Sequence, residues 1–267
     1  MKHLTTLVGL ISLVAAGDAC AVDERYAPYV AAPALAGAIE VAARPANARL
    51  MLLWREGFGA RHPAVRIGPL DAPPSDTVTA RAAIEALAVF VHKDNPLVCL
   101  PLEDLAVLFA GGATWGSAGL DGDWAARPVV VLDRPAGSER DFFVEAGLKG
   151  GAVAPDAKVV ARASILLREI GTAPGAVSFA PAGYRSDAVR ALRLSDGGDC
   201  MAPSEANAHR GFWPLARIVG IEARGAAARN MIDYVLSRDG QRDAVIAGYF
   251  ALPYVFAAED RKALGLD

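Results

Sequence analysis

The stretch Val129-Val-Val-Leu-Asp-Arg-Pro-Ala-Gly-Ser-Glu-Arg-Asp-Phe-Phe143 joins an apolar run to a charged segment through a proline and a glycine. The apolar run predicts a buried strand that ends at Asp133. After a turn, the residues from Ser138 to about Leu148 predict a helix. A strand followed directly by a turn and a helix is the repeating unit of α/β folds, so this stretch predicts an α/β architecture.

The same alternation of strands and helices extends to both sides of this stretch. The chain has 267 residues, a length that allows either one large domain or two smaller lobes. Predicted strands cover residues 39–42, 65–67, 84–91, 128–132 and 176–179, and predicted helices follow Asn47, Pro101, Ser164 and Met231. The first helix carries Leu50, Leu53 and Trp54 on one face.

Composition and charge narrow the class of protein. The chain has 27 Lys and Arg against 30 Asp and Glu, a net charge of −3, with 53% hydrophobic and 21% charged residues. Such values are typical of a folded globular protein. A dedicated binder of nucleic acid or of acidic membranes needs a basic excess, so both classes are disfavoured.

The N-terminal segment has the layout of an export signal. Lys2 precedes a short apolar run over 7–16, and Ala19-Cys-Ala21 is an A-x-A cleavage pattern. The run is shorter than the roughly 20 apolar residues that a membrane span requires. We therefore expect residues 1–21 to be a signal peptide, cleaved after Ala21.

Two cysteines, Cys99 and Cys200, remain after this cleavage. In an oxidising compartment they can form a disulfide, and the alternative is two buried free thiols. The sequence contains no CxxC and no Cys/His spacing typical of a metal site, so we predict no metal.

The turn after the central strand has groups suited to an anion. Arg134 offers a bidentate fork, Ser138 a hydroxyl, and Glu139 and Arg140 their backbone amides at a helix start, where the dipole favours negative charge. These groups can hold an oxyanion without a metal. The alternative is that Ser138 and Asp141 form a capping box, which satisfies the helix start internally.

No catalytic motif is present. The chain lacks a G-x-S-x-G elbow, a phosphate-binding GxxxxGK[ST] loop and an HExxH pair. His62, His92 and His209 stand before a proline, at a strand end and in a loop, and we interpret each as structural. We find no nucleophile with a matching base, and predict neither an enzyme nor a cofactor.

From about Leu35 to Pro253 the chain resembles the PstS-like family, the periplasmic phosphate-binding subunits of phosphate ABC transporters. The matching pieces occur in family order. They include His62-Pro-Ala-Val-Arg-Ile67, Phe212-Trp-Pro-Leu-Ala-Arg217 and Gly248-Tyr-Phe-Ala-Leu-Pro253, with further matches over 52–58, 88–97, 102–109, 115–124, 134–138, 173–177 and 236–241.

The resemblance implies a type II periplasmic binding protein fold with a ligand cleft between two lobes. Residues 22–91 with about 180–267 are expected to form lobe 1, and about 92–179 lobe 2. The implied function is periplasmic binding of phosphate or a related oxyanion for ABC-type uptake or sensing. The implied partners are that anion and an ABC transporter permease, and the protein is expected to be a monomer.

The resemblance also assigns roles to residues of the second lobe. Arg134 corresponds to the phosphate-clamping arginine, and Ser138 to the serine of a Ser-Gly-Thr anion turn. Here Glu139 and Arg140 replace the glycine and the threonine. Either the larger side chains block close approach of the backbone to phosphate, or Arg140 supplies a second charge.

The first lobe departs further from the family pattern. A Gly-Ser-Thr-like turn is replaced by residues 43–47, where Arg44 and Asn47 are the available donors. The segment with the aspartate that accepts the phosphate proton is shortened, and Asp76 with Arg81 is either its remnant or part of a solvent loop. The alternative function is therefore a degenerate binding fold that acts as an envelope protein-interaction module without phosphate binding.

Overall fold

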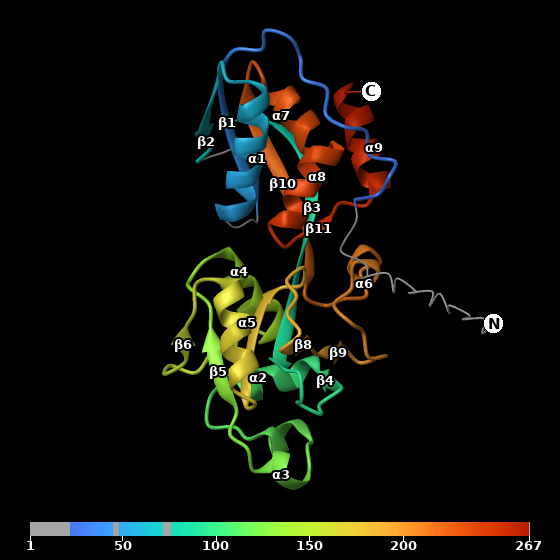
Figure 1. The fold of residues 1–267 in the computed structure, drawn as a ribbon. Helices are drawn as coiled ribbons and strands as arrows, with labels where there is room; N and C mark the ends of the chain where they lie inside the picture. The colour runs from blue at the N-terminus through green and yellow to red at the C-terminus, as the bar shows by residue number, and fades with distance from the viewer. Residues whose placement is uncertain (1–21, 45–47, 72–75, 267) are drawn as a thin grey trace, which may run out of the picture.

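The computed structural model describes residues 22–44, 48–71 and 76–266, so the predicted signal peptide lies outside the described residues. The molecule is elongated and has two halves joined by long strands (Figure 1). Among the described residues no helix is both long and apolar enough to cross a membrane.

One curled sheet runs through both halves in the order β2-β1-β10-β3-β7-β5-β6. In the first half, β1 pairs in parallel with β2 and antiparallel with β10, which pairs antiparallel with β3. The short β11 also pairs with β3. These strands are β1 (Gly37–Arg44), β2 (Val65–Pro69), β3 (Val78–His92), β10 (Ala216–Gly225) and β11 (Phe250–Ala251).

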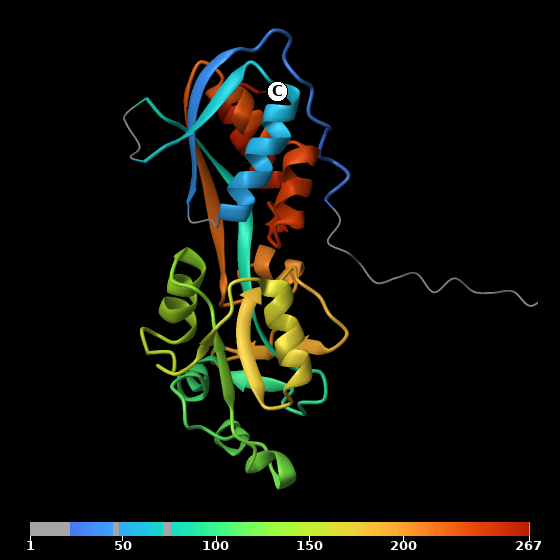
Figure 2. The same cartoon turned by 60° about the vertical axis from the view of Figure 1, so that its left-hand side comes forward.

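Strand β3 connects the two halves (Figure 2). Its residues 78–86 pair with β10, and residues 87–91 pair with β7 (Ala176–Pro181). Every residue from Ala82 to His92 is buried, which explains why the run 84–91 is apolar apart from Glu85. The predicted strand began at Ile84; it extends back to Val78 because the more polar start still pairs with β10.

Four helices cover the first half, and the helix predicted after Asn47 is one of them. It buries Leu50, Trp54 and Phe58 on one face, while Leu53 is partly buried. Trp54 Nε1 donates to the carbonyl oxygen of Gly240 at 2.8 Å. The helices are α1 (Ala48–Arg61), α7 (Ala228–Val235), α8 (Arg238–Ile246) and α9 (Tyr254–Leu264).

The second half is built on β7 with the parallel strands β5 and β6. The predicted helix from Ser138 begins as α4 and continues as a π-helical turn, Phe143–Gly147, whose Phe143 ring stacks on Phe179 at 3.9 Å between centroids. The remaining elements are β5 (Val130–Asp133), β6 (Lys158–Val159), α2 (Leu105–Phe109), α3 (Gly122–Ala125), α4 (Ser138–Phe142) and α5 (Ala163–Thr172).

Between β7 and β10 the chain forms several short elements. After β7 it forms β8 (Val189–Ala191), which pairs with the end of β3, and β9 (Arg193–Ser195), which pairs with β4 (Cys99–Pro101). These pairings join residues 189–195 to β3 and β4, and the expected lobe boundary near residue 180 stays a prediction. The short α6 (Glu205–His209) follows, and β10 then enters the first half.

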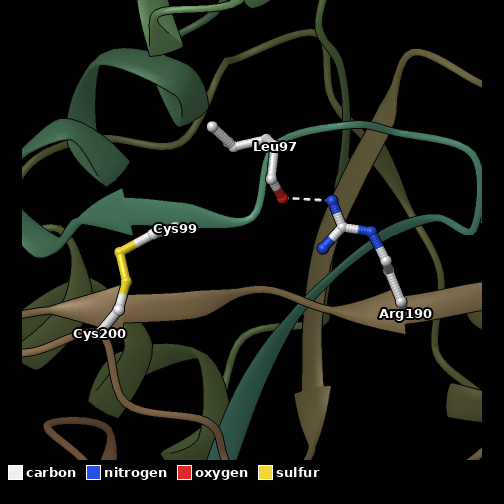
Figure 3. The surroundings of a disulfide bond; sticks show 4 residues. All are labelled: Leu97, Cys99, Arg190 and Cys200. Carbon is white, nitrogen blue, oxygen red and sulfur yellow. Dashed lines mark hydrogen bonds between the residues drawn. A yellow bond between two sulfur atoms is a disulfide. The ribbon is translucent and has the colours of Figure 1, made fainter.

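Cys99 and Cys200 form a disulfide with 6.1 Å between their Cα atoms (Figure 3). It ties β4 to the segment that follows β9. Nearby, the guanidinium of Arg190 donates to the carbonyl oxygens of Asn95 and Leu97. Of the two alternatives for these thiols, the structure has the bonded one.

Candidate functional site: a cavity between the halves

A cavity of about 770 Å³ is lined by the start of α1 and by residues of the second half. Figure 1 shows that the start of α1 faces the second half. Its size falls within the range of small-molecule sites. Both halves contribute to its wall, and three of its side chains are guanidinium groups. The lining residues are Ala48, Arg49, Arg134, Glu139, Ala161, Arg162, Ala163, Ser164, Pro181 and Tyr184.

Arg134 lines this cavity but is largely used by the protein itself. Its Nε donates to Glu139 Oε1 at 2.7 Å, and its Nη1 donates to the carbonyl oxygens of Val160 and Ala161 at 2.8 and 2.7 Å. Only 11% of the side chain is exposed. Of the five N–H groups of the guanidinium, the two on Nη2 have no partner among the described residues.

Among the described residues that line the cavity, Glu139 is the one carboxylate, at a position where the family pattern has glycine. Its Oε1 accepts the bond from Arg134, and its Oε2 accepts none within the part of the chain that the structure describes. The pair therefore offers a ligand the N–H donors on Nη2 of Arg134 and, next to them, the acceptor oxygen Oε2 of Glu139.

Ser138 does not line the cavity, and its hydrogen bonds are made to Arg217. Its Oγ and its carbonyl oxygen both accept from Nη2 of Arg217, each at 2.9 Å. The capping box is not formed: Gly137 precedes the helix with φ at 142°, no side chain caps it, and the amide of Asp141 donates to the carbonyl oxygen of Gly137. A positive φ of this size favours glycine, which explains the residue at this turn.

Arg140 is paired internally as well. Its Nε donates to Oδ2 of Asp133 at 2.8 Å, while Oδ1 of the same carboxylate accepts from the amide of Arg134 at 2.7 Å. Arg140 is not in the cavity wall. Its position gives no support to its use as a second charge for a ligand.

Of the two donors predicted in the first half, Arg44 does not line the cavity. Asn47 lies outside the described residues. Arg44 donates to the carbonyl oxygens of Leu70 and Asp71 and forms an ion pair with Glu222 at 3.5 Å. Arg49, which sequence reasoning missed, lines the cavity instead.

Asp76 and Arg81 also lie away from the cavity wall. Asp76 is exposed. Arg81 binds the carboxylates of Asp260 and Glu259 at 2.6 and 2.8 Å and lies over the ring of Phe256, so it anchors α9.

Arg162 and Ser164 contribute to the cavity from the start of α5. Both are exposed, and neither side chain has a hydrogen bond or ion pair among the described residues. The signal that identifies them is the one used for Arg134: a charged residue between a strand and a helix start. The predicted helix began at Ser164, and Arg162 lies two positions before that start.

The known proteins similar to this chain are phosphate-binding proteins by name. No family model matches. The phosphate-binding protein PstS of Pseudomonas aeruginosa PAO1 is 26% identical over 321 aligned positions, which cover 98% of this chain and 99% of that protein.

Solved structures share the fold at lower identity. A possible phosphate binding protein from Planctomyces limnophilus is 18% identical with a TM-score of 0.65, covering 81% of this chain and 93% of that one. An ABC-type phosphate transport receptor from Vibrio cholerae is 21% identical with a TM-score of 0.62, covering 77% and 96%.

The fold and the cavity between its halves define the class: the chain has the type II periplasmic binding protein fold, which confirms the predicted fold class. The likeness along nearly the whole chain is more specific. Over nearly its whole length the chain is similar to a PstS protein, in agreement with the resemblance seen in its sequence.

Proposed function

We propose that this protein is an exported solute-binding protein that takes phosphate or a related oxyanion into the cavity between its halves. The observation that carries the proposal is the cavity wall, where Arg49, Arg134 and Arg162 stand against the single carboxylate of Glu139. Guanidinium groups match the geometry of tetrahedral oxyanions. The name of the Pseudomonas relative, a phosphate-binding protein, supports the same ligand.

The binding mode we propose differs from the one that the resemblance implies. Arg49 approaches the anion from the first half and Arg162 from the second, so a bound anion draws the halves together. Arg134 contributes through Nη2, while Ser138 and Arg140 hold the turn in shape. The amides of Ala163 and Ser164, which have no partner among the described residues, add donors at the start of α5.

Export and transport are part of the proposal. Residues 1–21 are removed after Ala21, and the mature protein delivers its anion to an ABC transporter permease as a monomer without catalysing a reaction. The mass of the protein recovered from the periplasm tests the first step. We expect an N-terminus at Val22, and an uncleaved chain would contradict export by this signal.

Calorimetric titration with phosphate tests the ligand. The purified protein is unfolded and refolded to remove any bound anion. We expect micromolar or tighter binding, worth at least about 8 kcal/mol. We also expect the Arg49→Ala/Arg162→Ala variant to bind at least about tenfold more weakly, a loss of about 1.4 kcal/mol.

A second candidate is an interaction module of the same fold. The internal pairing of Arg140 and of Ser138 favours it, because groups assigned to the ligand by resemblance are already occupied. The same titration decides between them. A folded protein that gives no heat with phosphate, sulfate or arsenate supports this second candidate and contradicts the first.

A further inference from the structure

We propose that Arg217 is a positioning residue for the cavity: from the strands that cross between the halves, it fixes the start of α4 and thereby the Arg134–Glu139 pair. Arg217 is not itself in the cavity wall, and the resemblance, whose 212–217 piece ends at this residue, gave it no role. The inference rests on the proposed function.

Arg217 stands where the crossing strands change partners. It is the register partner of Glu85 across β10 and β3. Only two positions further along, from Leu87, β3 leaves β10 and pairs with β7 of the second half. At this level of the sheet β3 passes from pairing with β10 to pairing with β7.

The side chain of Arg217 is held on three sides. Nε donates to Oε2 of Glu85 at 2.6 Å, Nη2 donates twice to Ser138, and the guanidinium carbon lies 4.0 Å from the centroid of the Phe142 ring. Ser138 and Phe142 are the first and last residues of α4. A single guanidinium thus fixes both ends of this short helix to the crossing strands.

The buried carboxylate of Glu85 keeps the guanidinium of Arg217 in place. Its side chain is 1% exposed, and a buried carboxylate requires a paired, hydrogen-bonded partner. Arg217 is that partner and remains 23% exposed. Because the ion pair keeps Nε at Glu85, Nη2 is left in one place, at the start of α4.

The consequence for the cavity follows from chain connectivity. Glu139 is the next residue after Ser138, and its Oε1 holds Arg134. Arg134 in turn holds the carbonyl oxygens of Val160 and Ala161, directly before Arg162. The chain of contacts therefore runs from Arg217 through Ser138, Glu139 and Arg134 to the second-half wall of the cavity.

Arg217→Lys is the variant that separates positioning from folding. An ammonium group retains a positive charge beside Glu85, but it lacks a second nitrogen with which to reach Ser138. The matched control is Arg193→Lys, since Arg193 is exposed on β9 and its side chain has no partner among the described residues.

Two measurements on the full chain test the inference. Hydrogen exchange without ligand is expected to be faster over residues 138–142 in Arg217→Lys and unchanged in Arg193→Lys. Titration with inorganic phosphate is expected to show a dissociation constant raised about tenfold by Arg217→Lys. The Arg193→Lys control is expected to bind like the wild type.

The outcomes separate this inference from the proposed function. Wild-type binding of phosphate together with unchanged exchange and affinity in Arg217→Lys overturns the positioning role alone. A wild-type protein that binds no phosphate overturns the proposed function, and this inference with it. If Arg217→Lys unfolds, Ser138→Ala provides the second test: it removes one of the two bonds to Arg217 and keeps the Glu85 pair, and unchanged exchange there also contradicts the inference.

Discussion

Two segments of the second half face the same cavity, residues 133–140 and residues 161–164, and they use their charges differently. In the first, Arg134 and Arg140 are paired with carboxylates of their own segment. In the second, Arg162 has no such partner among the described residues. The difference teaches that an arginine at a strand-to-helix turn marks either a self-supporting turn or a ligand contact, and that its neighbours decide which.

The largest expected effect comes from breaking an internal pair. Arg134→Ala leaves the Glu139 carboxylate and two carbonyl oxygens without their donor at a site that is 11% exposed. We expect the free energy of unfolding to fall by about 3 kcal/mol. Arg162→Ala is expected to change it by less than about 0.5 kcal/mol. Urea unfolding measures both, and equal losses would remove the distinction between the segments.

Removal of the disulfide is expected to affect both segments equally, because both lie between Cys99 and Cys200 in the chain. The Cys99–Cys200 bond closes a long loop, with a sequence separation of 101 residues. We expect Cys99→Ser/Cys200→Ser to lower the free energy of unfolding by about 2–4 kcal/mol. Phosphate affinity is expected to stay at the wild-type value at temperatures where the variant is folded. A selective loss of affinity would show that the disulfide shapes the cavity.

Phosphate affinity is expected to depend on the second segment more than on the first, which is the reverse of the order expected for stability. We expect Arg162→Ala to weaken phosphate binding about tenfold, or about 1.4 kcal/mol, without loss of stability. Arg140→Ala is expected to change affinity less than Arg162→Ala does, because Arg140 is bound to Asp133 and lies outside the cavity wall. Calorimetry on the two variants checks this order, and the reverse order would return the ligand to the turn at 138–140.

A further effect is a pH dependence of stability at Glu85, which is paired with Arg217. Burial raises the pKa of Glu85 to about 7, and the ion pair with Arg217 opposes this only in part. The folded state therefore holds this proton more tightly than the unfolded state does. Its stabilising contribution is complete below about pH 4.5 and is lost as the pH rises through about 7.

Unfolding of the wild type and of Glu85→Gln at the same pH values isolates this contribution. We expect the stability of the wild type relative to the variant to decrease from about pH 5 to about pH 8. A difference that is constant over this range would contradict the raised pKa.

The strands and helices were predictable because their apolar patterns are local. The buried run 84–91 and the face carrying Leu50 and Trp54 appear in the structure nearly as expected. The pairing of β8 and β9 with β3 and β4, far away in sequence, was not predicted. Such pairings leave no local pattern.

The cavity wall was less predictable than the fold. Arg134 and Glu139 were identified from the turn, and both line the cavity. Ser138 and Arg140 were identified by the same reasoning, yet Arg217 and Asp133 occupy them. Arg217 lies 79 positions from Ser138, and no spacing in the sequence indicates that the two meet. Partners of this kind become visible only in the folded chain.

The most direct test is a crystal structure of the protein grown with phosphate. The account predicts the anion in the cavity between the halves, bonded to Arg49 and Arg162 with Nη2 of Arg134 within reach, and Ser138 still bonded to Arg217. Phosphate seated on Ser138 and Arg140, with their present partners displaced, would contradict it.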